Sequence, residues 1–231
     1  MKRSKLYRAR MALVDRQVYL PLEEAFKILK RMPLAKFDET VEISFRLGID
    51  PRQSDQIVRG AMVLPKGTGK TNRVAVVAAG EAAEAAKAAG ADEVGFEELV
   101  ERIKGGYLDF DVLIATPDAM KVVRTLGRVL GPRGLMPNPK TGTVTDDVAT
   151  AVNEAKGGRV EYRCDRAGCV HVPIGKLSFP PEDLLANADA VIQQIVRARP
   201  SGAKGVYMQS ATVCATMSPG VRVDVKSLAK A

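Results

Sequence analysis

Residues 67–71, with the sequence GTGKT, are the part of the chain most similar to a catalytic motif. A phosphate-binding loop uses such glycines to let backbone amides surround phosphate groups, and a lysine to reach them. That motif needs another glycine five residues before Gly69, where this chain has Leu64. The loop must also open a helix, whereas residues 73–79 (RVAVVAA) have the composition of a buried strand. We therefore predict a hinge here and not a site of nucleotide hydrolysis.

Cys164, Cys169 and His171 are the candidate metal ligands. Zinc prefers four ligands, and no second ligand pair follows in the sequence. Cys164 also falls on the apolar positions of a strand, so packing is the favoured interpretation over metal binding. The sequence offers neither a nucleophile elbow nor a glycine motif for a dinucleotide. We predict a protein that is not an enzyme, with no metal, no cofactor and no small-molecule substrate.

Positive charge is concentrated in the two outer parts of the chain. Residues 1–66 carry 14 Lys and Arg against 8 Asp and Glu (net +6), residues 159–231 carry 10 against 6 (net +4), and residues 67–158 carry 11 against 13 (net −2). These values sum to the whole-chain charge of +8. A basic surface attracts a polyanion, so we predict that the outer segments bind nucleic acid together.

The three cysteines, an odd number and scattered along the chain, are typical of free thiols in a reducing cytoplasm. No apolar run approaches the ~20 residues that span a bilayer, and the basic start of the chain is not followed by a signal-peptide core. We predict a cytoplasmic protein with no membrane partner.

The outer segments show the patterns of an antiparallel sheet with helices. Apolar residues alternate with polar ones in two runs, 160–164 and 170–174, which flank a turn and predict a hairpin. The remaining expected elements are helices at 22–32 and from Pro180 on, and strands at 41–47, 61–64 and 205–216.

The middle of the chain alternates strands and helices, which indicates a parallel sheet between two helix layers. The expected strands are 73–79 and 112–115, and the expected helices are 81–89, 96–103, 116–130 and 146–156. The fold class is thus an α+β split domain (residues 1–66 and 159–231) with an inserted three-layer, Rossmann-like α/β domain (67–158). The predicted hinge residues between the two domains are Lys66, Gly67, Gly69, Gly157 and Gly158.

Two loops are candidate contacts to RNA. Residues 131–142 are rich in glycine and proline and carry Arg133 and Lys140, which favours a secondary contact over a plain connector. Lys36 and Phe37 place a charge beside a ring just before a strand, although a phenylalanine is more often part of a core.

Six segments resemble one known family, that of bacterial large-subunit ribosomal protein one, the protein of the mobile lateral stalk. The segments are AKFDETVE (35–42), LGIDPRQSDQIVRG (47–60), GRVLGPRGLMPNPKTGTV (127–144), GKLSFPPE (175–182), KGVY (204–207) and TMSPGVRV (216–223). They follow the family's order and cover nearly the whole chain. The resemblance implies a two-domain protein in which the split domain makes the main RNA contact.

The resemblance also implies partners and site residues. The partners are the lateral stalk of large-subunit ribosomal RNA, a similar structure in the protein's own messenger, whose translation it represses, and exit-site transfer RNA, whose release involves the stalk. The chain would be ribosome-bound. The residues on the main RNA surface would be Lys36, Phe37, Thr40, Ser210, Thr216, Met217 and Ser218. The family usually has glycine where this chain has Ser218, whose hydroxyl could donate to RNA. A nonspecific DNA-coating protein is the remaining alternative.

Overall fold

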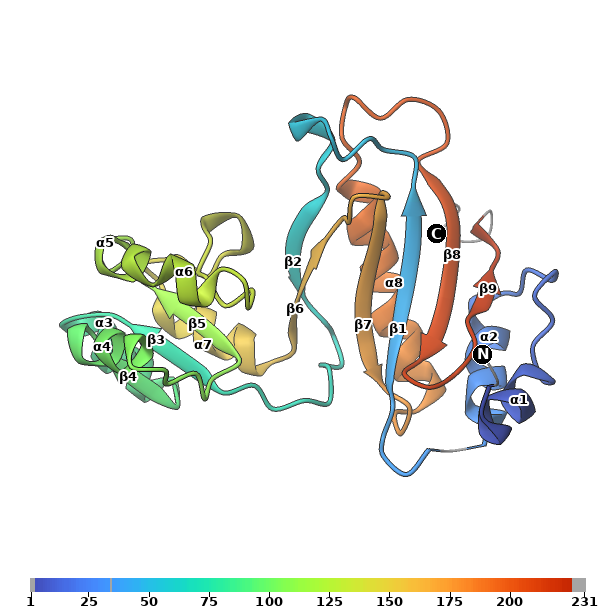
Figure 1. Ribbon diagram of the computed structural model, residues 1–231, viewed down its shortest axis with the longest axis horizontal. Coiled ribbons are helices and arrows are strands. Elements are labelled where there is room, and N and C mark those ends of the chain that lie inside the picture. Colours follow the sequence, from blue (N-terminus) through green and yellow to red (C-terminus); the bar gives the residue numbers. More distant parts are fainter. Residues whose placement is uncertain (1–2, 34, 226–231) are drawn as a thin grey trace. The chain divides into compact units, whose positions relative to one another are not determined.

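The polypeptide leaves one structural unit and returns to it later in the chain. The computed structural model describes residues 3–33 and 35–225, apart from the side chain of Lys140. Its contacts divide them into a split unit, the described residues up to Gly69 and from Val160 on, and a middle unit, Lys70–Arg159. Figure 1 colours the split unit blue to cyan and orange to red. The predicted domain boundaries, 66/67 and 158/159, stay a prediction beside this division at 69/70 and 159/160.

The split unit is built on a four-stranded antiparallel sheet with the order β7-β1-β8-β9. Ile43 of β1 lies opposite Val172 of β7 and Val213 of β8. Successive side chains point to opposite faces of a sheet, so the alternating sequence gives one apolar face and one polar face. The four strands span Cys169–Lys176 (β7), Thr40–Leu47 (β1), Met208–Ala215 (β8) and Val221–Val223 (β9).

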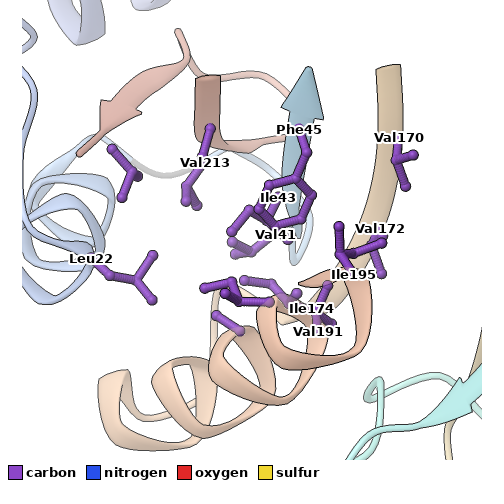
Figure 2. Packing of buried hydrophobic residues seen from close by; sticks show 14 of the residues in the cluster. Leu22, Val41, Ile43, Phe45, Val170, Val172, Ile174, Val191, Ile195 and Val213 are labelled. Carbon is purple, nitrogen blue, oxygen red and sulfur yellow. The ribbon is translucent and has the colours of Figure 1, made fainter. Parts of the chain in front are cut away.

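Two helices cover the apolar face, α2 (Leu22–Arg31) and α8 (Pro181–Arg197). Proline suits the first turn of α8, because its φ is fixed near the helical value and its missing N–H would have had no partner there. Figure 2 shows Val191 and Ile195 of α8 packed toward the sheet. The other elements of this unit are α1 (Lys5–Met11), the 3-10 turn η1 (Ser54–Gln56), and the paired strands β2 (Arg59–Val63) and β6 (Arg159–Arg163).

The middle unit is a parallel sheet, ordered β4-β3-β5, with helices on both faces. Val74 and Val76 of β3 pack against α3 and α7, whereas Ala75 and Val77 face the cluster of α4, α5, η2 and α6. The strands are Val74–Val77 (β3), Glu93–Gly95 (β4) and Val112–Ala115 (β5). The helices are Glu81–Ala88 (α3), Glu97–Lys104 (α4), Met120–Val123 (α5), Arg124–Leu126 (η2), Gly127–Leu130 (α6), Pro139–Thr141 (η3) and Val148–Lys156 (α7).

The predicted hairpin of residues 160–164 and 170–174 is wrong. Its turn forms, with the Asp165 N–H donating to the Cys169 carbonyl at 2.8 Å. Beyond the turn the strands take different partners, because β7 pairs with β1 while β6 pairs with β2. Already at Cys164 the backbone N–H donates to the carbonyl of Val58 at 2.9 Å. Alternation identifies the buried face of a strand but not the strand beside it.

The predicted helix 116–130 is also wrong in extent, since the segment forms α5, η2 and α6 in succession. Gly127 lies where the 3-10 turn gives way to α6, and glycine is a poor helix former. Five short elements were not predicted, namely α1, β4, β9 and the 3-10 turns η1 and η3.

The first linker is fixed to α8 by one buried asparagine. The Asn187 side chain accepts from the Lys66 N–H at 2.9 Å and donates to the carbonyls of Gly67 and Ile174 at 3.0 and 2.8 Å. Lys66 also pairs with Asp183, with 3.3 Å between Nζ and Oδ1. Two predicted hinge residues are therefore held by the split unit. Gly69, Gly157 and Gly158 stay a prediction as hinge positions.

Asn187→Leu removes these hydrogen bonds while nearly preserving side-chain volume. Because it leaves buried backbone groups without partners, we expect the free energy of unfolding to fall by about 2–4 kcal/mol in urea titrations. Gln193→Leu, at an exposed position of the same helix, is the control and should change it by no more than about 0.5 kcal/mol. Equal stabilities of the two variants would contradict the role of Asn187.

Candidate nucleic-acid interface

The face of the four-stranded sheet opposite the core is polar. We call it the open face; its side chains are exposed or half-buried, and they come from Thr40, Glu42, Ser44 and Arg46 of β1, Cys169 and His171 of β7, and Ser210, Thr212 and Cys214 of β8. Ser44 lies opposite both His171 and Thr212, and its Oγ is 2.9 Å from Nδ1 of His171. Short hydroxyl side chains on a sheet suit close contact with sugar hydroxyls and phosphates.

Thr40 and Thr216, 176 residues apart in the sequence, bind each other at one end of this face. The Thr216 N–H donates to the Thr40 carbonyl, and the Thr40 N–H donates to the Thr216 hydroxyl, both at 3.1 Å. The Lys176 ammonium group donates to the Thr40 hydroxyl at 2.9 Å. The structure thus brings together two predicted site residues from the two ends of the chain. Lys176, which belongs to one of the family motifs, was not predicted.

A buried ion pair between Arg10 and Glu39 supports this end of the face. The Arg10 guanidinium donates to both carboxylate oxygens of Glu39, at 2.5 and 3.1 Å, and also to the carbonyl of Pro33. The Arg10 and Glu39 side chains are 1% and 0% exposed. Glu39 Oε2 also accepts from the Met217 N–H at 2.8 Å. One carboxylate therefore connects helix α1 to the backbone of a predicted RNA-contacting residue.

The pKa of Glu39 reflects these contacts. Burial alone would raise the pKa of the carboxyl, but the hydrogen bonds from Arg10 and Met217 and the charge of Arg10 favour the ionised form more strongly. The net result is a pKa below the usual value for glutamate. Glu39 is thus ionised at neutral pH.

Ser218 takes part in the turn that follows Thr216. Its N–H donates to the Ala215 carbonyl at 2.9 Å, and its hydroxyl accepts from the Ala215 N–H at 2.8 Å. None of the described non-glycine residues has a positive φ, so this position does not require glycine. The serine hydroxyl is already used within the turn, while the Met217 side chain beside it is 52% exposed.

Lys36 and Phe37 are exposed in the loop before β1, and residue Phe37 as a whole is 54% exposed. Asp38 fixes this loop by accepting hydrogen bonds from the backbone and hydroxyl of Ser178 at 3.2 and 2.7 Å. An exposed ring beside an anchored residue suits stacking on a base. Phe37 is therefore outside the core, so the more common role of a phenylalanine does not apply to it.

Ser210 lies at the other end of the open face, opposite Arg46. Thr216 lies six positions further along the chain, which corresponds to about 20 Å of extended backbone. Between them Cys214 donates its thiol hydrogen to Glu42 at 3.2 Å. Burial, together with this carboxylate, raises the pKa of Cys214 to about 12. Ser210 is thus the one predicted site residue within β8, while Thr216 follows the strand, and Cys214 is a neutral thiol.

The predicted secondary contact belongs to the middle unit. Arg133 is exposed in the turn at Gly131–Gly134, and the side chain of Lys140 lies outside the described part of the structure. The loop is anchored at its end, where the Thr143 hydroxyl accepts from the Asn138 N–H at 2.8 Å. The role of Arg133 and Lys140 in RNA binding stays a prediction.

The residues considered for other chemistry have ordinary structural roles. Lys70 pairs with Asp111, with 2.7 Å between Nζ and Oδ1, and the stretch after it leads into strand β3. Cys164 is buried in the core. In residues 3–33 and 35–225 we find no group of three or more His, Cys, Asp or Glu side chains that could hold a metal ion.

Among the helices that the structure describes, none combines the length and the apolar character needed to cross a bilayer.

Arg10→Met tests the support that the ion pair gives. It leaves the Glu39 carboxylate buried without its cation, so we expect the free energy of unfolding to fall by about 3–5 kcal/mol at pH 7. The native pair contributes stability above the unfolded-state pKa of Glu39 and loses it as pH falls through the lowered folded-state pKa. The free energy of unfolding of the variant should therefore come closer to that of the native protein as the pH is lowered from 7 to 3. Urea titrations at both pH values, with the exposed Arg8→Met as control, check this; a difference independent of pH would refute it.

Comparison with known proteins gives the family of the chain. The model of the ribosomal protein L1p/L10e family matches residues 28–219. The chain is 59% identical over 226 residues to large ribosomal subunit protein uL1 of Methylobacillus flagellatus, covering 98% of each chain. It is 57% identical to the proteins of the same name from Polynucleobacter asymbioticus, covering 98% of this chain and 97% of the relative, and from Azoarcus sp., covering 96% of each.

These matches confirm the predicted resemblance. They also agree with the prediction that the protein is not an enzyme, because the matched family is one of ribosomal proteins. The chain belongs to the ribosomal protein L1p/L10e family.

Proposed function

We propose that this protein is a structural constituent of the large ribosomal subunit and binds ribosomal RNA of the lateral stalk through the open face. The observation that carries the proposal is the junction of Thr40 with Thr216, which joins the outer segments into one polar face. The names of the relatives, which are large ribosomal subunit proteins, support the ribosome as the particle to which the protein belongs. The protein would be ribosome-bound in the cytoplasm.

Charge supports the same surface. The outer segments carry net charges of +6 and +4, while the middle segment carries −2. Basic residues attract phosphates over long range, and the hydroxyls of the open face supply short-range contacts. Lys36, Phe37, Thr40, Ser210, Thr216, Met217 and Ser218 are the proposed contact residues, with Arg133 and Lys140 of the middle unit as a secondary contact.

The finer parts of the proposal concern domains and other RNAs. The split unit would be an α+β RNA-binding domain, and the middle unit an inserted, Rossmann-like α/β domain that moves on the two linkers. The same face would bind a similar structure in the protein's own messenger and so repress its translation. Exit-site transfer RNA would be a further partner, because stalk movement accompanies its release.

Thr216→Val tests the open face. The variant loses the hydroxyl that accepts from the Thr40 N–H, so the junction of the outer segments is weakened. We expect stalk-RNA binding to weaken by about 1–3 kcal/mol in filter-binding titrations, with the fold retained. Thr125→Val, at an exposed position of the middle unit, should bind like the native protein. Unchanged affinity of Thr216→Val would remove Thr216 from the surface.

Competition between RNAs tests the partners. If stalk RNA and the messenger leader use one face, each should displace the other at ~0.2 M salt, where nonspecific binding is weak. Duplex DNA should not displace either. Simultaneous binding of both RNAs would argue against a shared face, and efficient displacement by DNA would favour the nonspecific alternative.

A further inference from the structure

A hollow beside the proposed RNA surface is bounded by the first described residues of the chain. Arg3, Ser4, Leu6 and Tyr7 line it together with Met217, and its volume is about 410 Å³. Small-ligand sites occupy roughly 300–1,000 Å³, so this space suits one nucleotide. Met217 links the hollow to the open face, because Met217 directly follows Thr216.

The side chains of the hollow favour a planar, aromatic ligand. The guanidinium carbon of Arg3 lies 4.6 Å from the centroid of the Tyr7 ring. Guanidinium planes and aromatic rings are the groups on which proteins stack unpaired bases of RNA. Leu6 and Met217, 36% and 52% exposed, add apolar contact at the edge.

Charge around the hollow favours a phosphate-bearing ligand. Between Arg3 and Val14 the sequence has no acidic residue. Arg3, Lys5 and Arg8 are exposed, and no ion pair joins them to any residue that the structure describes. Arg10, in contrast, is neutralised by Glu39. Arg3 lines the hollow itself, and Lys5 and Arg8 follow it closely in the sequence as exposed cations of α1.

We propose that this hollow binds one unpaired nucleotide of the same RNA that occupies the open face. Its base stacks against Arg3 and Tyr7 and contacts Met217, and its phosphate is attracted by the cations of α1. None of the described residues that line the hollow carries a carboxylate, which suits an RNA phosphate. This inference rests on the proposed function, since Met217 belongs to the proposed RNA surface.

Binding of the full-length protein to two RNAs tests the inference. One probe is a stalk-RNA fragment with its unpaired nucleotides, and the other is the same fragment with those nucleotides replaced by base pairs. We expect Tyr7→Ala and Arg3→Gln to bind the first probe about tenfold more weakly than the native protein, the loss expected for one stacked base. For the paired probe, Tyr7→Ala should bind like the native protein, and Arg3→Gln should lose no more affinity than a variant that lacks another exposed cation.

Matched variants separate stacking from charge and folding. Arg8→Gln removes one positive charge from α1 without changing the lining of the hollow. Its loss of RNA affinity should be smaller than that of Arg3→Gln on the first probe and equal for both probes. Tyr7→Phe keeps the ring and should bind like the native protein. If thermal denaturation shows that Tyr7→Ala is not folded, the substitution at the exposed Arg3, Arg3→Gln, tests the inference instead.

The inference would be overturned if Tyr7→Ala and Arg3→Gln bound the first probe with native affinity. It would also be overturned if Arg3→Gln and Arg8→Gln lost equal affinity for that probe. Either result would leave the proposed function intact. Failure of the native protein to bind the first probe would instead refute the proposed function.

Discussion

The position of β1 between β7 and β8 is the constraint on which the rest of the structure depends. Its backbone is hydrogen-bonded on both edges to strands that follow it by more than a hundred residues. Buried backbone groups need such partners, so the split unit requires both outer segments of the chain. The intervening residues must leave the unit and return to it, so the middle unit is inserted between the two segments of the split unit. The register also sets Ser44 between His171 and Thr212, so the pairing that builds the core arranges the polar face as well.

Much of this fold could be predicted from local patterns, and the errors show what those patterns lack. The alternation at Val41, Ile43 and Phe45 gives the buried face of β1 directly. The same kind of alternation at residues 160–164 led to a wrong partner, because periodicity contains no information about neighbouring strands. β4 and β9 were missed because three residues are too few to show a period.

The candidate site was predicted mainly by resemblance, and the structure adds the contacts that no motif contains. Thr40 and Thr216 belong to separate motifs, and only the antiparallel register brings them together. The sequence did not indicate that Arg10 is buried, because an arginine among other basic residues is typical of a solvent-exposed helix face. Its burial depends on Glu39, 29 residues later, and on the Pro33 carbonyl. Such a pair is recognisable only once the two side chains are placed in space.

The buried pair of Arg10 and Glu39 has more to do with position than with stability. Burying two charges costs desolvation free energy that their attraction offsets only in part, so an apolar pair of similar size would often serve stability equally well. An apolar side chain at position 39, however, would leave the Met217 N–H without its acceptor and α1 without its link to the turn at Met217. The carboxylate thus fixes two neighbours of the proposed RNA surface at once, although it is itself hidden from solvent. The Arg10 guanidinium and the Met217 N–H are thereby held by one internal anion.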